Sequence, residues 1–72
     1  MRTLKTISGK ECVKILCNHF GFEIKRQKGS HIILRKNSSG TVVPNHHEIK
    51  IGTLKGILKL ADVDEEEFMK YV

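Results

Sequence analysis

The chain is poor in aromatic residues and cysteine, has no tryptophan and contains a single proline. Its 72 residues have the length of one domain, which we place at residues 1–72. A chain this short buries only about 60–65% of its unfolded surface, so any site should lie at the surface or in a shallow cleft. No apolar run approaches the about 18 residues of a membrane-spanning helix. The N-terminal MRTLKTISGK lacks the apolar core of a signal peptide, so we expect a cytoplasmic protein that contacts no membrane.

Several kinds of site are disfavoured by what is missing. Cys12 and Cys17 form neither a C-x-x-C motif nor a disulfide framework, so we expect two reduced thiols in or near the core. The clustered carboxylates of a magnesium-dependent nuclease are absent from the basic part of the chain. His46 and His47 are adjacent, a spacing at which two histidines chelate one zinc ion poorly. We therefore expect no metal and no other cofactor.

Charge is what the sequence has in excess, with a net charge of +5. Residues 1–36 hold nine lysines and arginines against two glutamates, a net charge of +7. Residues 61–72 hold five carboxylates against one lysine, a net charge of −4. A basic body with a short acidic end favours a polyanionic partner for the body, and a nucleic acid is such a partner.

Helical periodicity and capping residues predict three helices. Ser8, with Glu11 three residues later, forms the capping box of a first helix, which Gly21 is placed to end. Thr53 is the expected cap of a second helix with an apolar stripe. Asp64 is the expected cap of a third, whose three glutamates suit the positive end of the helix dipole.

Between the first two helices, alternating residues predict a three-stranded antiparallel sheet. Ile24 and Arg26 are expected on one face of the first strand, and His31, Ile33 and Arg35 on one face of the second. The resulting order, α-β-β-β-α with a further helix, is an α+β fold in which helices cover one face of the sheet and leave the other to a ligand. The predicted strands are residues 22–27, 31–36 and 41–44.

The stretch RQKGSHIILRK places a histidine directly after a glycine-serine turn. Gly29 would let the backbone approach a phosphate without a Cβ in the way, and Ser30 offers a hydroxyl and a backbone N–H. The imidazole of His31 suits proton transfer, because its unperturbed pKa of about 6.5 lies near working pH. The neighbouring cations that could neutralise a backbone phosphate are Lys25, Arg26, Lys28 and Arg35.

RNA is the substrate that fits this set of groups. Its 2′-hydroxyl is an internal nucleophile beside the phosphorus, so a protein need only move protons and stabilise the phosphoryl oxygens. No metal is then required, and DNA is excluded because it lacks the 2′-hydroxyl.

An ordered set of motifs runs along the chain: Gly21 and Phe22, Arg26, the Gly-Ser-His run at 29–31, Pro44, His46, Glu48 and the Gly-Thr-Leu run at 52–54. In this order and spacing, the chain from about Leu16 to Phe68 resembles the HicA (YcfA-like) mRNA interferase toxins of bacterial and archaeal toxin–antitoxin systems.

The resemblance implies a double-stranded-RNA-binding-like fold and metal-independent cleavage of mRNA that arrests translation. It also implies neutralisation by a HicB-type antitoxin that covers the active site. By motif, His31 is the catalytic residue and Gly29 the residue that keeps the turn open.

Several roles stay open at this stage. The general acid could be Lys28, Arg35 or His46, and His46 could instead hold the linker before the second helix. Ser30 could orient His31 or bind phosphate. Two other functions compete: a non-catalytic RNA-binding module and a protein-interaction domain. An RNA-binding module would more often display exposed aromatic residues for base stacking, and this chain has few.

Overall fold

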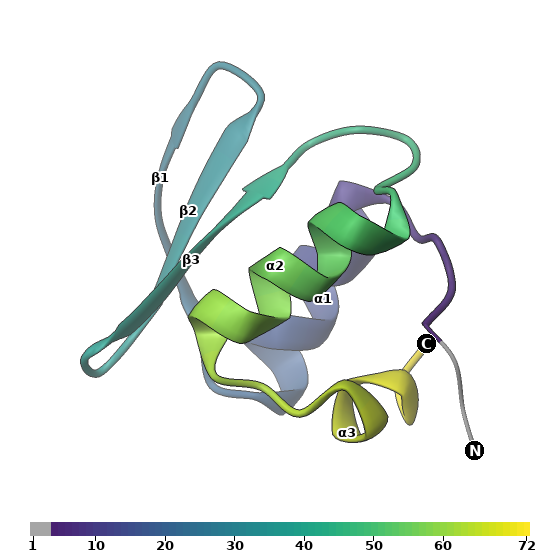
Figure 1. The fold of residues 1–72 in the computed structure, drawn as a ribbon. Helices are drawn as coiled ribbons and strands as arrows, with labels where there is room; N and C mark the ends of the chain where they lie inside the picture. Colours follow the sequence, from purple (N-terminus) through teal and green to yellow (C-terminus); the bar gives the residue numbers. More distant parts are fainter. Residues whose placement is uncertain (1–3) are drawn as a thin grey trace.

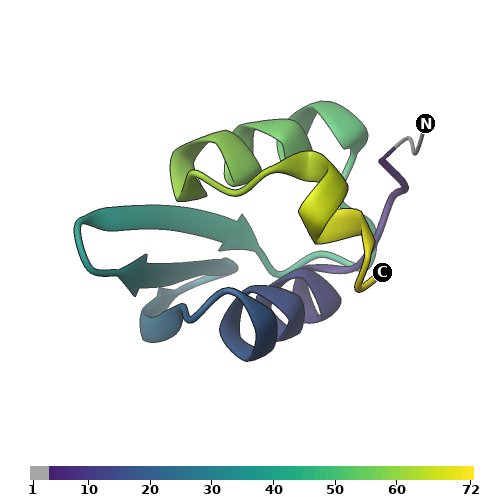
Figure 2. The same ribbon diagram turned by 90° about the horizontal axis from the view of Figure 1, so that it is seen from below.

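The computed structural model describes residues 4–72 and has the predicted α+β fold (Figures 1 and 2). Three antiparallel strands form one open sheet in the order β1-β2-β3. The two long helices lie on the same side of the sheet in Figure 1, and α3 lies beneath both of them. The elements are α1 (Gly9–His19), β1 (Glu23–Lys28), β2 (His31–Lys36), β3 (Ser39–Pro44), α2 (Ile51–Ala61) and α3 (Glu65–Met69).

Helix α1 begins and ends where its capping residues predict. The hydroxyl of Ser8 accepts a hydrogen bond from the backbone N–H of Glu11 at 3.1 Å. Gly21 follows the helix with φ +77°, the left-handed conformation that commonly ends helices. The buried face of α1 includes Cys12, which confirms that this thiol lies in the core.

The cap of α2 is not the one predicted. The helix begins before Thr53, and its N-cap is Lys50, which makes no side-chain capping bond. Thr53 therefore lies within the first turn, and its prediction as the cap was wrong. A capping side chain acts from the residue with extended backbone directly before the helix, and here that residue is Lys50, with φ −66° and ψ 152°. At the other end, Asp62 ends the helix in the left-handed conformation with φ +58°.

Strand β1 departs from simple alternation. Ile24 lies opposite Leu34, but Arg26 lies opposite Ile33, so Lys25 is an extra residue in a β-bulge. Paired residues of an antiparallel sheet share a face, so Ile24 and Arg26 lie on opposite faces. The prediction that they share a face was wrong, because a sequence pattern of period two does not reveal an inserted residue.

The other two strands alternate as predicted. In β2, Ile32 and Leu34 are buried beneath the helices, whereas His31 and Arg35 are exposed on the open face and Ile33 is half-buried there. Strand β3 begins at Ser39, two residues before the predicted start, because the turn before it is shorter than expected.

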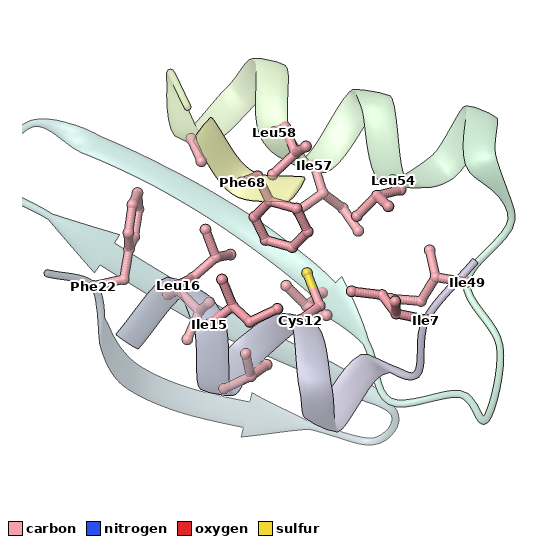
Figure 3. Packing of buried hydrophobic residues seen from close by; sticks show 14 of the residues in the cluster. Ile7, Cys12, Ile15, Leu16, Phe22, Ile49, Leu54, Ile57, Leu58 and Phe68 are labelled. Atoms are coloured by element: carbon pink, nitrogen blue, oxygen red, sulfur yellow. The ribbon is translucent and has the colours of Figure 1, made fainter. Parts of the chain in front are cut away.

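One hydrophobic cluster lies between the sheet and the helices. Figure 3 shows the ring of Phe68, which is fully buried, between the side chains of α1 and those of α2. Helix α3 thus places an aromatic side chain in the core, and its own start is fixed by Asp64, which accepts a hydrogen bond from the N–H of Glu67. No helix within residues 4–72 is long and apolar enough to cross a membrane.

Candidate nucleic-acid interface and active site

His31 is the first residue of β2 and lies at one end of the sheet. Its neighbours across the strands are Lys28 on β1 and Pro44 on β3. Its side chain is exposed on the face of the sheet that the helices leave open. The imidazole is therefore accessible to a large ligand and has an ammonium group on the adjacent strand.

The turn before His31 has a backbone conformation that favours glycine at position 29. Gly29 has φ +60°, and no atom lies within 4 Å of where its Cβ would be. The side chain of Gln27 donates a hydrogen bond to the carbonyl oxygen of Gly29 at 3.1 Å. The positive φ favours glycine, and the open space means that a ligand could approach the turn backbone closely.

A backbone hydrogen bond joins the turn to the segment that follows β3. The N–H of Asn45 donates to the carbonyl oxygen of Ser30 at 2.6 Å. This bond holds the Gly-Ser-His turn beside the Pro-Asn-His segment, although thirteen to seventeen residues of sequence separate them. His46, whose side chain is exposed, lies two residues beyond Pro44, the strand neighbour of His31.

The first residue of α1 packs against the Pro-Asn-His segment. The N–H of Gly9 donates to the carbonyl oxygen of His46 at 2.8 Å. A Cβ at Gly9 would lie 2.1 Å from the carbonyl oxygen of Pro44 and 2.9 Å from the Cα of Asn45. Only glycine leaves room for this approach, since real Cβ atoms essentially never come within 3.0 Å of another heavy atom. Gly9 was not among the candidate residues, and a glycine directly after a helix cap is the signal that could have found it.

The candidate cations are spread along the sheet. Lys28 lies opposite His31, and Arg26 is two register rows further along the same open face, opposite Ile33. Arg35 lies four residues from His31 along β2, which at about 3.3 Å per residue is about 13 Å. Lys28 therefore lies beside His31, Arg26 lies midway along the strand, and Arg35 lies at the other end.

The basic side chains of the sheet form no ion pair with any residue that the structure describes. Within residues 4–72 the ion pair present joins Glu67 to Lys70, far along the chain from the sheet. The open face between the cations is partly apolar, because Ile33 is half-buried and its neighbour Val42 on β3 is 40% exposed. The open face of the sheet therefore presents basic side chains around the small apolar surface of Ile33 and Val42.

The two thiols are unsuited to chemistry at this face. Burial raises the pKa of Cys12 to about 12, so this thiol stays protonated at neutral pH. Burial, and secondarily the carboxylate of Glu23, also raises the pKa of the half-buried Cys17. Both are free thiols, as predicted. In the described part of the chain, no three histidine, cysteine or carboxylate side chains gather in a way that could hold a metal ion.

A protein-family model described as the HicA toxin of bacterial toxin–antitoxin systems matches residues 9–63. The chain belongs to the HicA toxin family. No curated protein sequence and no solved structure matches it significantly. Membership of a toxin–antitoxin family implies an antitoxin partner for this HicA toxin.

The family match begins at Gly9 and includes the whole site around His31. It ends before α3, so the helix that inserts Phe68 into the core is outside the matched region of this HicA protein. Most of the acidic C-terminal end, residues 61–72, also lies outside the matched region.

Proposed function

We propose that the protein is a toxin that cleaves RNA without a metal ion, with His31 as the group that moves the proton. The observation that best supports this is the position of His31: exposed, directly after an open glycine turn and opposite Lys28. A phosphodiester lying over the turn could meet the imidazole, the lysine and the turn backbone together.

The reaction proceeds by attack of the 2′-hydroxyl on the adjacent phosphorus. A base takes the hydroxyl proton, the bond between the 2′-oxygen and phosphorus forms, and the bond from phosphorus to the 5′-oxygen breaks. An acid supplies a proton to the leaving 5′-oxygen. The products are a 2′,3′-cyclic phosphate and a 5′-hydroxyl, and no oxidant or second substrate is consumed.

The neighbouring residues take the remaining roles. Lys28 stabilises the charge that develops on the phosphoryl oxygens, and Arg26 binds the phosphate next to it on the same face. The backbone of the Gly29–Ser30 turn lies against the RNA. Because Arg35 is about 13 Å away along the strand, Lys28 and His46 are the remaining candidates for the acid.

We further propose that the antitoxin is of the HicB type and that it blocks this end of the sheet. A surface with free cations attracts an acidic partner, and the same cations would bind RNA. RNA and the antitoxin should then compete. Simultaneous binding of both in a titration would contradict this part of the proposal.

The decisive experiment is incubation of the purified protein with RNA in EDTA. Wild type is compared with His31→Ala and with His19→Ala, a control whose ring stacks on Tyr71 at 3.8 Å, away from the sheet. We expect cleavage in EDTA by wild type and His19→Ala, ending in 2′,3′-cyclic phosphate, and a loss of at least about 100-fold in His31→Ala.

Three results would count against the proposal. Loss of cleavage on chelation would mean that a metal takes part. Wild-type rates in a folded His31→Ala protein would remove His31 from the mechanism. RNA binding that weakens with salt, but with no product at any protein concentration, would indicate a binding module in place of an enzyme.

The acid is identified by three further variants. If His46 donates the proton, His46→Ala slows cleavage, whereas the adjacent His47→Ala keeps the wild-type rate. If Lys28 is the acid, His46→Ala keeps the wild-type rate and Lys28→Gln loses activity.

A further inference from the structure

A second group of basic side chains lies at the opposite end of the sheet from His31. In Figure 1 the turn between β1 and β2 and the turn between β2 and β3 mark these two ends. At the second end there is a cavity of about 350 Å³, within the range of ligand pockets. It is lined by Gly21, Glu23, Lys25, Arg35, Lys36 and Asn37.

Three separate features of the fold bring the cations together. Lys25 is the extra residue of the β-bulge, while Arg35 and Lys36 end β2 on the neighbouring strand. The side chain of Lys36 passes Gly21, with its Cε 3.5 Å from where a Cβ of that glycine would be. The side chain of Lys36 therefore lies next to Gly21, in the lining of the cavity.

Within the described residues 4–72, none of these three cations forms an ion pair. Three positive groups and the one carboxylate of Glu23 give the lining a formal net charge of +2. Glu23 lies opposite Arg35 in the sheet, yet within residues 4–72 the ion pair present is elsewhere, between Glu67 and Lys70. Gathering like charges is unfavourable, and an anionic ligand would offset that repulsion.

We propose that Lys25, Arg35 and Lys36 form a second phosphate-binding site, which holds the RNA backbone away from the bond that is cut. This inference rests on the proposed function, because it takes RNA as the ligand. Arg35 and His31 are separated by about 13 Å, which a stacked strand spans with about four nucleotides at about 3.4 Å each. One RNA strand running along β2 can thus occupy both ends of the sheet, so the second site fixes the direction and register of the strand over His31.

The test measures binding of a ten-nucleotide RNA to the full chain carrying His31→Ala, so that the RNA is not cut. In that background, Arg35→Gln/Lys36→Gln is compared with Lys55→Gln/Lys59→Gln. The control removes the same two charges from exposed positions of α2. Affinity is measured over a range of salt concentrations, and thermal unfolding checks that each protein is folded.

Removing one cation that binds a phosphate of a single strand should reduce the slope of log K against log[salt] by about 0.7. We expect Arg35→Gln/Lys36→Gln to reduce the slope by about 1.4 and the RNA affinity by about 25-fold at about 0.1 M salt. The difference in affinity between this variant and its parent should disappear as the salt concentration approaches about 1 M. The control should keep the parental slope to within about 0.3.

Equal slopes and affinities in the two double variants would overturn the second site. So would unchanged RNA affinity together with weaker binding of the antitoxin, because the cluster would then be a protein contact. The proposed function is judged separately, by cleavage with the wild-type residue at position 31. If that protein cuts no RNA but the slope still falls as expected, the second site stands and the enzymatic proposal fails.

Discussion

Gly9→Ala is the substitution that most directly tests how the site is held together. An ideal Cβ at Gly9 would lie 2.1 Å from the carbonyl oxygen of Pro44, 2.9 Å from the Cα of Asn45 and 3.1 Å from the N of His46. All three are backbone atoms, so no side chain can rotate away and the two segments must separate. Overpacking of this kind costs about 1–3 kcal/mol.

Two further effects modify this value. Separation weakens the 2.8 Å hydrogen bond from Gly9 to His46, which contributes about 1 kcal/mol. In the opposite direction, alanine is favoured over glycine in a helix by up to about 1 kcal/mol. The two nearly cancel, so we expect a net destabilisation of about 1–3 kcal/mol. In a domain of this size that lowers the Tm by roughly 5–20 °C.

The matched control is Gly56→Ala in α2. No atom lies within 4 Å of a Cβ at Gly56, so only the helix-propensity gain acts there, and stability should rise by about 0.5–1 kcal/mol. Urea and thermal unfolding measure both variants. A Gly9→Ala protein as stable as wild type would refute the close approach, and a destabilised Gly56→Ala protein would refute the claim of open space.

The same substitution should also disturb the site. Displacing the segment at Asn45 weakens its 2.6 Å hydrogen bond to Ser30, the residue before His31. Under conditions where Gly9→Ala is fully folded, we expect faster hydrogen exchange at the Asn45 amide and reduced RNA cleavage. Wild-type exchange at that amide would show that the turn and the segment are held independently of α1.

Four other substitutions or treatments test separate parts of the fold. Thr41→Val should cost about 1 kcal/mol in urea unfolding, because the buried Thr41 hydroxyl donates a 2.9 Å hydrogen bond to the carbonyl of Ile57; an unchanged midpoint would argue against this link between β3 and α2. Asp64→Ala should cost about 0.5–2 kcal/mol through loss of the α3 cap, whereas Asp64→Asn should retain most of the stability. At pH 8, iodoacetamide should label Cys17 before the buried Cys12, and equal rates would contradict the burial of Cys12. Burial raises the pKa of the Cys12 thiol from 9.0, its value in the unfolded chain, to about 12, so the unfolded state loses this proton first as the pH rises. The contribution of Cys12 to the free energy of unfolding should therefore fall between about pH 9 and 12. The difference in stability between wild type and Cys12→Ala should shrink over the same range.

Most of the fold could be predicted because its signals are local. Ser8 and Asp64 cap their helices as expected, since a capping residue acts on N–H groups two or three positions away. The alternation in β2 correctly placed His31 on the same face as Ile33 and Arg35, because side chains of a strand alternate whatever lies beside it. The wrong predictions concern features that depend on residues elsewhere in the fold. The bulge at Lys25 arises in the pairing of β1 with β2, and Thr53 is not the cap because α2 already begins at Ile51.

The sequence by itself determined the composition of the site: a histidine after a glycine turn, surrounded by cations, with a second histidine motif further along the chain. Only the tertiary structure decided how these groups are distributed. Pairing of three strands places Lys28 next to His31 and moves Arg35 about 13 Å away, to the Lys25–Arg35–Lys36 cluster. Close packing of Gly9 against Pro44, together with the bond from Asn45 to Ser30, brings the two histidine motifs to one end of the sheet. The physical reason is that strand register and backbone approach depend on contacts between residues far apart in the chain, which no local pattern encodes.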